Sequence, residues 1–533
     1  MKKKSLTIIA LTLFFLTIQE ASSSSIETKA EEYLQKLTLP EKVGELFMVG
    51  FRETKMSQAT SAHFKKYPFQ NFILFSHNIN DSLQTKQLLI DLKKLSPHPL
   101  FFSTDQEGGD IIRIKEKEFR TPSAMALGAT KDSKLVYQTA LHLGHKMKEL
   151  GFNLNLAPVL DINSNANDSV MGNRSFGGTP EIVSQMGKEF IRGLQESGIS
   201  ATAKHFPGHG NSLGDSHEGV SRLPYSFDKL KNIDLIPFKE AIKNDVDIIM
   251  TAHVTFPGEE LPVTLSPKYL QTLLRQELGF KGIILSDDLE MAAILKRYGI
   301  KKGVEMSFLA GSDMIMVTGK KSTQIEAFNS ILNAVQEKRI SEERLNESVK
   351  RILTIKFKRQ EQSEKTSRLP SSDMNREIAQ KAFTIIHKKA NQKDLLGSHK
   401  KILVLTTHYG FFRETKKSFP QSTFKYLKQF PTRAEENRLL SELERTSKNF
   451  DVIIVGFNRN THAKIVEKMT EKLKTPIISI SFSTPYFEYK YDKTALFVCI
   501  YDHNVEALQT VVAYLRGEYS PTTLSCLSHT PCN

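Results

Sequence analysis

Eight short apolar segments recur along the first 360 residues of the chain, and amphipathic helical patterns separate them. Each segment is continuously apolar, which is typical of parallel strands that are buried on both faces. Eight such strands alternating with helices predict a (β/α)8 barrel of the TIM type, in the α/β class. The predicted strands are residues 45–51, 71–76, 100–105, 152–157, 199–204, 247–252, 282–287 and 313–318. The helical patterns are clearest in residues 134–150, 180–197 and 324–336.

Several of the predicted strands end in an ionisable residue. In barrels of this kind the active site lies at the carboxyl ends of the strands. We therefore expect these side chains to meet in one site. The ionisable residues at or just after strand ends are His77, Asp105, Lys204, His205, His253, Asp287 and Asp288.

The last third of the chain has a separate strand pattern. A polar stretch over residues 358–373 is typical of a linker, and a helix is predicted over residues 374–389. Further apolar segments predict a smaller three-layer α/β/α domain. We expect the barrel to occupy residues 26–360, a linker and connecting helix residues 361–397, and the C-terminal domain residues 398–533. The apolar segments are residues 401–405, 451–455, 476–480 and 495–500.

The N-terminus has the pattern of a secretory signal peptide over residues 1–25. Three lysines precede an apolar run over residues 6–18, and small residues follow at 21–25. The run is shorter than the roughly 20 residues that a transmembrane helix needs, although a retained N-terminal anchor stays open as an alternative. We expect an exported protein, either periplasmic or extracellular.

Charge and cysteine content narrow the choice of partners. Lys and Arg number 73 against 59 Asp and Glu, which gives a net charge of +14. Most of this charge is expected to lie on solvated helix faces, and it fits loose association with an anionic cell envelope. No nucleic-acid motif accompanies it.

Cys526 and Cys532 are close enough in sequence to form a disulfide, whereas Cys499 lies in an apolar run and is expected to be a buried thiol.

The segment KHFPGHGNSLGDSHEGVSRLP, residues 204–224, holds the densest group of candidate catalytic side chains. It follows a predicted strand, and its glycines permit tight turns near a ligand. Asp215 and His217 are two residues apart, so the carboxylate can orient the imidazole and raise its basicity.

Three further segments place charged residues at the same end of the barrel. In GIILSDDLEM, Asp287 and Asp288 follow a strand, so one can be a nucleophile while the other caps the next helix. In STDQEGGDIIR, Asp105 can accept hydrogen bonds from substrate hydroxyls. In MGNRSFGG, Arg174 lies between glycine-containing turns, either to bind substrate or to anchor the loop.

The motifs DQEGG, NRSFG, KHFPGHG and SDDLEM, in this order, resemble glycoside hydrolase family 3 over about residues 39–358. Within that family they are most similar to the bacterial β-N-acetylhexosaminidase branch. The resemblance implies that Asp287 is the nucleophile and that His217 is the acid/base, with Asp215 as its partner. The positions that match sugar-binding residues of the family are Asp105, Arg113, Arg174, Lys204 and His205, while His209 and Asp288 match positions of a structural kind.

The resemblance implies a retaining exo-β-N-acetylhexosaminidase that needs no metal and no organic cofactor. Its substrates would be small carbohydrates with terminal N-acetylglucosamine, from peptidoglycan fragments or chitin-type oligosaccharides. Three alternatives stay open: a β-glucosidase or β-xylosidase of the same family, a metal-dependent barrel hydrolase, and a non-catalytic carbohydrate-binding protein. In the metal-dependent case the candidate ligands are His205, His209, His253 and Asp287. The sequence leaves the oligomeric state open.

Overall fold

The eight predicted barrel strands form one parallel sheet that closes on itself almost completely. The computed structural model describes residues 25–163, 171–210, 221–361, 373–397, 400–487 and 490–521. A parallel bridge between Leu285 and Met314 joins the two ends of the sheet, so the predicted barrel is confirmed. The spatial order of the strands is β10 (Ile315–Val317), β1 (Phe47–Val49), β2 (Asn71–Ile73), β3 (Phe101–Thr104), β4 (Leu154–Asn155), β5 (Ser200–Phe206), β7 (Ile248–Thr251) and β9 (Ile283–Leu285).

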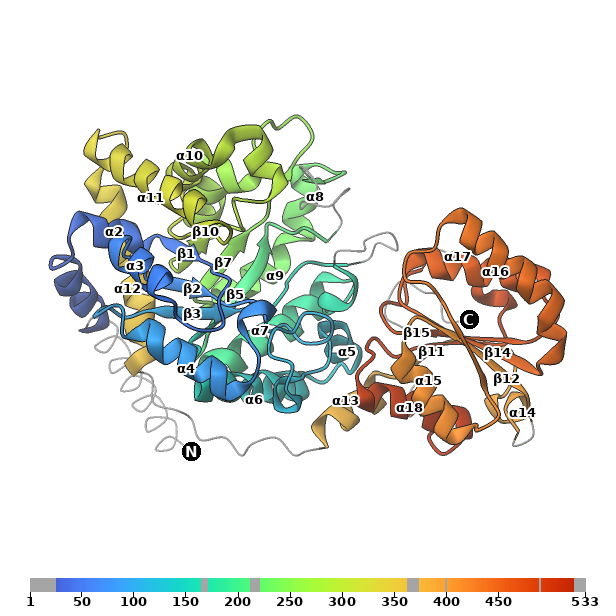
Figure 1. Ribbon diagram of the computed structural model, residues 1–533. Helices are drawn as coiled ribbons and strands as arrows, with labels where there is room; N and C mark the ends of the chain where they lie inside the picture. The colour runs from blue at the N-terminus through green and yellow to red at the C-terminus, as the bar shows by residue number, and fades with distance from the viewer. Residues whose placement is uncertain are drawn as a thin grey trace, which may run out of the picture.

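Helices surround this sheet and bury their apolar faces against it (Figure 1). In α6, Asp132 caps the first turn by accepting hydrogen bonds from the backbone N–H groups of Lys134 and Leu135, and Gly151 ends the helix with φ of 108°. The labelled α-helices are α2 (Leu39–Glu45), α3 (Gln58–Lys66), α4 (Ser82–Lys93), α5 (Ala124–Ala129), α6 (Ser133–Leu150), α7 (Pro180–Glu196), α8 (Phe227–Asn232), α9 (Leu235–Lys243), α10 (Ala292–Ala310), α11 (Lys321–Gln336) and α12 (Glu342–Glu361). A π-helix, Lys268–Glu277, precedes β9. A short two-stranded ribbon pairs β6 (Ser221–Arg222) with β8 (Val254–Thr255).

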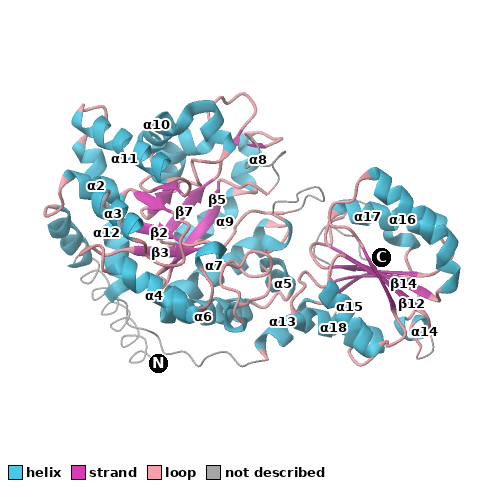
Figure 2. Ribbon diagram, in the orientation of Figure 1, coloured by secondary structure: helices cyan, strands magenta, loops and turns pink. Residues whose placement is uncertain are grey.

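The C-terminal residues form a second, six-stranded sheet between two helical layers, as the three-layer prediction requires. Figure 2 shows α16 and α17 on one face and α15 and α18 on the other. All neighbouring strands are parallel except β11 and β16. The strand order is β11 (Thr384–Lys388), β16 (Leu496–Cys499), β15 (Ile477–Ser481), β14 (Val452–Phe457), β12 (Ile402–Thr406) and β13 (Thr423–Tyr426). The helices are α13 (Met374–Ala382), α14 (Gln392–Leu395), α15 (Tyr409–Ser418), α16 (Arg433–Thr446), α17 (Asn460–Lys472) and α18 (Val505–Arg516).

Some predicted boundaries between the two parts are wrong. The helix expected over residues 374–389 ends at Ala382, and β11 follows as an edge strand of the second sheet. The second sheet therefore begins before residue 398, inside the segment assigned to the connecting helix. At the other boundary, α12 continues to Glu361, so the linker does not begin at residue 358.

Of the predicted signal peptide, residues 1–25, all but the last residue lie outside the described residues, as do Cys526 and Cys532. Within the described part of the chain, no helix has both the length and the apolar character needed to cross a membrane. Cys499 is a free, fully buried thiol in β16, as predicted.

Helix α12 closes the amino end of the barrel through buried ion pairs. Lys356 Nζ lies 2.7 Å from Glu45 Oε2, and the two side chains are 1% and 0% exposed. Three residues further along, Arg359 donates to both carboxylate oxygens of Asp247, which directly precedes β7. Because each carboxylate precedes a strand, α12 fixes several strand starts at once.

Replacing Lys356 by methionine is expected to lower the free energy of unfolding by about 3–5 kcal/mol, because Glu45 is left buried without its partner. Urea denaturation measures this loss. The double variant Glu45→Leu, Lys356→Met should regain most of the lost stability, since it removes the second charge as well. Lys350→Met on the same helix is the matched control: the Lys350–Glu31 pair is 41% and 44% exposed, so its loss should cost less than about 0.5 kcal/mol. Equal losses for the Lys356 and Lys350 variants would contradict the prediction.

Candidate active site

A cavity of about 310 Å³ opens at the carboxyl ends of the barrel strands. All residues that line it lie between residues 73 and 318, so they belong to the barrel. Its charged and polar lining is Asp105, Glu107, Arg113, Arg174, Lys204, His205, His209, Asp287, Asp288 and Thr318. Its apolar lining is Ile73, Phe75, Ile111, Leu156, Met171, Met250, Met291 and Met316.

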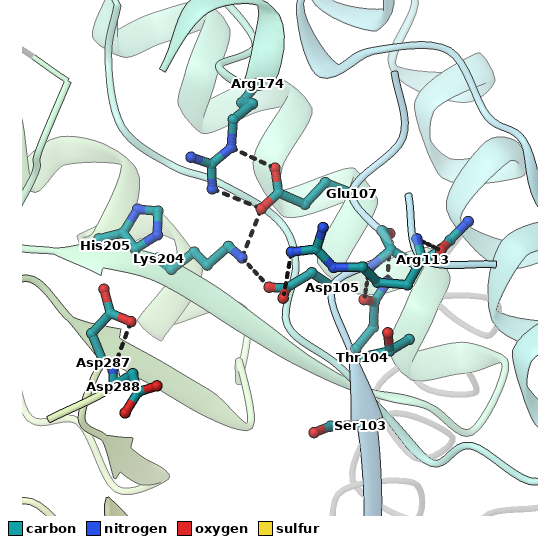
Figure 3. A network of polar contacts seen from close by, with 12 residues as sticks. Ser103, Thr104, Asp105, Glu107, Arg113, Arg174, Lys204, His205, Asp287 and Asp288 are labelled. Atoms are coloured by element: carbon teal, nitrogen blue, oxygen red, sulfur yellow. Dashed lines mark hydrogen bonds and ion pairs between the residues drawn. The ribbon is translucent and has the colours of Figure 1, made fainter. Parts of the chain in front are cut away.

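A network of alternating charges forms one wall of the cavity (Figure 3). Lys204 Nζ lies between two carboxylates, 2.9 Å from Asp105 Oδ1 and 2.7 Å from Glu107 Oε1. Arg174 holds Glu107 through two hydrogen bonds of 2.8 Å each. Arg113 lies 3.3 Å from Asp105 Oδ2. Each carboxylate thus has two cationic partners, which fixes both side chains in place.

These cations keep the wall charged although it is buried. Burial raises the pKa of Asp105, but the charges of Lys204 and Arg113 outweigh it and hold the pKa below its usual range. Burial likewise raises the pKa of Glu107, and Arg174 and Lys204 reverse the shift and hold the pKa well below normal. The carboxylates can therefore accept hydrogen bonds from the hydroxyl groups of a ligand at neutral pH.

Asp161 holds the two histidines of the cavity, His205 and His209, in place through hydrogen bonds. Its carboxylate accepts hydrogen bonds from the backbone N–H of His209 at 2.6 Å and that of His205 at 3.2 Å, and its Oδ2 lies 2.7 Å from Nδ1 of His205. Asp161 is fully buried. Burial lowers the pKa of His209 to about 4, so this imidazole is neutral at physiological pH.

Asp287 and Asp288 follow β9 and take different directions, as the sequence predicts. In Figure 3 the carboxylate of Asp287 points toward the side of the cavity that holds His205 and Lys204. Its Oδ1 accepts a hydrogen bond of 2.8 Å from the backbone N–H of Asp288. Asp288 instead accepts hydrogen bonds from Thr318 Oγ1 and from the backbone N–H of Glu290. Both carboxylates line the cavity, but that of Asp288 is engaged by Thr318 and Glu290.

The sequence profile of the glycosyl hydrolase family 3 N-terminal domain matches residues 38–355, which is more than half of the chain. The chain belongs to glycosyl hydrolase family 3. The residues that match the family profile form the barrel of this family 3 enzyme, and the chain is a glycoside hydrolase.

Relatives of this family 3 enzyme carry more specific names. It is 32% identical over 334 residues to Beta-hexosaminidase A of Pseudoalteromonas piscicida, which covers 57% of this chain and 56% of that protein. It is 36% identical over 256 residues to the Beta-hexosaminidase of Neisseria gonorrhoeae strain NCCP11945, which covers 46% and 71%. Among solved structures, a family 3 β-N-acetylglucosaminidase from a Paenibacillus species superimposes with a TM-score of 0.81 at 31% identity, over 92% of this chain and 99% of that one.

The structure brings most of the predicted site residues of the family 3 enzyme into one cavity. Asp105, Arg113, Arg174, Lys204, His205 and Asp287 all line it. Asp215 and His217, the predicted acid/base pair, lie outside the described residues. His253 does not line the cavity: its ring nitrogens contact Thr264 Oγ1 at 2.9 Å and the carbonyl oxygen of Asp288 at 3.0 Å.

Sequence reasoning did not single out Glu107, Asp161 or Thr318. Glu107 lies in the DQEGG motif, two residues after Asp105, so its place in that motif could have identified it as a site residue. Asp161 follows β4 by six residues in the short stretch Leu160-Asp161-Ile162, where a carboxylate between two apolar residues is the only hint of a buried role.

The pKa of Asp288 in the family 3 enzyme is raised to about 6, because the carboxyl is buried and lies beside Glu290 and Asp287. The usual value is about 3.9, so folding favours the protonated form. Its contribution to stability is therefore present below about pH 4 and is lost as the pH rises through 6. We expect the free energy of unfolding of the wild type, relative to Asp288→Asn, to fall between pH 4 and pH 7. Urea denaturation of both proteins across this range measures it, and a difference that does not change with pH would contradict the assignment.

Proposed function

We propose that this family 3 enzyme is a retaining exo-β-N-acetylhexosaminidase that removes terminal β-linked N-acetylglucosamine. The observation that carries the proposal is the placement of Asp287 at the end of β9, facing a cavity whose wall is built from Asp105, Lys204, Glu107 and Arg174. The names of the similar proteins support the choice of an N-acetylated amino sugar.

The size of the cavity supports exo action. Ligand pockets usually have volumes of about 300–1,000 Å³, and the cavity, at about 310 Å³, is at the lower end of this range. One terminal sugar ring suits such a space, with the leaving group outside it. Asp105, Lys204 and Arg174 would bind the sugar through charge-assisted hydrogen bonds. The chain has no Trp, so aromatic contacts must come from Phe or Tyr, and Phe75 lines the cavity.

In the proposed reaction, Asp287 attacks the anomeric carbon while the bond from that carbon to the leaving oxygen breaks. His217 gives its proton to the leaving oxygen, and Asp215 orients the imidazole. A water molecule then loses a proton to His217 and attacks the same carbon, which releases Asp287. Two displacements at one carbon retain the β configuration. The roles of His217 and Asp215 rest on their motif.

The proposed natural substrates are peptidoglycan fragments or chitin-type oligosaccharides, met after export through the N-terminal signal segment. The support for export is the sequence of residues 1–25, and the net charge of +14 fits work near an anionic envelope. A panel of 4-nitrophenyl glycosides with purified muropeptides beside it tests the proposal. Turnover of the N-acetyl-β-glucosaminide is expected, unchanged by a chelator. Activity on the β-glucoside with none on the N-acetyl-β-glucosaminide would overturn the substrate choice.

A further inference from the structure

One of the contacts that the second domain makes with the barrel beside the active site is a turn, residues 501–503. Tyr501 lies two residues after the end of β16 and adopts φ of 59°, in the left-handed region. Its hydroxyl donates a hydrogen bond of 2.8 Å to Thr384 Oγ1 in β11, which fixes the turn to the second sheet. Tyr501 and Asp502 are 0% and 2% exposed, so this turn is a buried part of the domain junction.

This turn holds two barrel loops at once. The carbonyl oxygen of Tyr501 accepts hydrogen bonds from Ser123 Oγ at 2.8 Å and from Asn173 Nδ2 at 3.2 Å. The Asp502 carboxylate accepts the backbone N–H of Ser123 at 2.7 Å. Next along the chain, His503 Nδ1 lies 3.2 Å from Asp110 Oδ1. Three consecutive residues of the second domain therefore contact two neighbouring barrel loops.

Both loops lead directly to the charged wall of the active site. Asn173 is the neighbour of Arg174 in the chain. On the other loop, Gly109 donates its N–H to the carbonyl of Thr121 at 3.0 Å, and it packs so closely on Ser123 that a Cβ on Gly109 would lie 2.5 Å from Ser123 Cβ. Gly109 is two residues from Glu107. The turn thus fixes the backbone on both sides of the Arg174–Glu107 pair.

We propose that the Tyr501–Asp502 turn is a positioning element, through which the second domain sets the distance between Glu107 and Arg174 and so the sugar-binding geometry of the barrel. The second domain contributes no side chain to the cavity lining within the described residues. The effect of the turn on the reaction passes through Ser123 and Asn173. This inference rests on the proposed glycosidase activity for its kinetic readout.

Asp502→Asn tests the proposal in the full chain. In the wild type, Asp502 Oδ1 also accepts the backbone N–H groups of His503 and Asn504, at 2.6 and 2.9 Å. An asparagine has only one acceptor oxygen, so its NH2 group would have to face either these two N–H groups or that of Ser123. We expect KM for 4-nitrophenyl N-acetyl-β-glucosaminide to rise about tenfold, because small displacements of binding groups weaken substrate contacts strongly. kcat should change less, since Asp287 follows β9, whereas the turn contacts Ser123 and Asn173 in other loops.

Asp451→Asn is the matched control: Asp451 also accepts a backbone N–H, that of Lys401 at 2.7 Å, but within the second domain. It should leave KM unchanged.

Should Asp502→Asn fail to fold, Asn173→Ala removes a single hydrogen bond to the turn and should raise KM in the same direction. A lowered melting temperature with wild-type KM in both variants would overturn the inference. A wild-type protein without glycosidase activity would instead overturn the proposed function.

Discussion

Replacing Asp287 by alanine is expected to lower kcat on an N-acetyl-β-glucosaminide by about 10⁴-fold or more, since loss of a covalent nucleophile has effects of this order. The affinity for free N-acetylglucosamine should change little, because the charged wall of Asp105, Lys204 and Glu107 stays intact. Steady-state kinetics and calorimetric titration with the sugar measure the two effects separately.

Azide offers a sharper readout for the same variant. With the Asp287 side chain gone, a small anion can occupy its space and attack the anomeric carbon from that face, giving a glycosyl azide of α configuration. Asp91→Ala on α4 is a control, since Asp91 lies on the surface and contacts Gln87 and Lys94 of the same helical segment. Full turnover by Asp287→Ala, or a β-configured azide product, would refute the assignment of Asp287 as nucleophile.

The second large effect is expected for Lys204→Met. Lys204 is 2% exposed and is the shared partner of Asp105 and Glu107. Its loss leaves two buried carboxylates short of positive charge, so the free energy of unfolding should fall by about 3–5 kcal/mol. KM should rise by about 10–100-fold, the cost of losing charge-assisted hydrogen bonds. Urea denaturation and steady-state kinetics measure these changes.

The pH dependence of this variant follows from the lowered pKa values of the two carboxyls. A carboxyl with a lowered pKa stabilises the wild type above its unfolded value of about 4, and this stabilisation is lost as the pH falls. Without Lys204 the pKa values of Asp105 and Glu107 rise, so the acid limb of both stability and activity should move to higher pH. Lys188→Met, at the more exposed pair with Glu240, should leave both profiles in place. An unshifted acid limb in Lys204→Met would contradict this account.

The barrel could be predicted from the sequence because each of its strands is buried on both faces. Each of the eight apolar segments overlaps a strand of the first sheet, and only β5 runs beyond its predicted end. The second sheet was predicted only in part, and the two strands that escaped are its edges. β13, Thr423–Tyr426, is exposed or half-buried along its length. β11, Thr384–Lys388, follows α13 after a single residue, so its apolar residues extend the helical pattern.

Some residues of the candidate site could be predicted from the sequence, whereas the contacts of others depend on how the loops fold. Asp105, Lys204 and Asp287 stand at strand ends, where barrel topology alone predicts that they converge. The role of Glu107 depends on a loop that turns back so that its carboxylate meets Arg174, 67 residues away. Asp161 likewise contacts the backbone N–H groups of His205 and His209. Every residue except proline has such a group, so the residue types do not predict these contacts.

The ion pairs of α12 also set an order of events during synthesis. Lys356 is 311 residues from Glu45, and at about 5–20 residues per second the ribosome adds it roughly 15–60 s later. Until then the carboxylates of Glu45, Asp247 and Asp313 lack their α12 partners, and burying them is costly. We therefore expect the amino end of the barrel to be the last part to become stable, and a chain stopped before residue 359 to unfold more readily than the full chain.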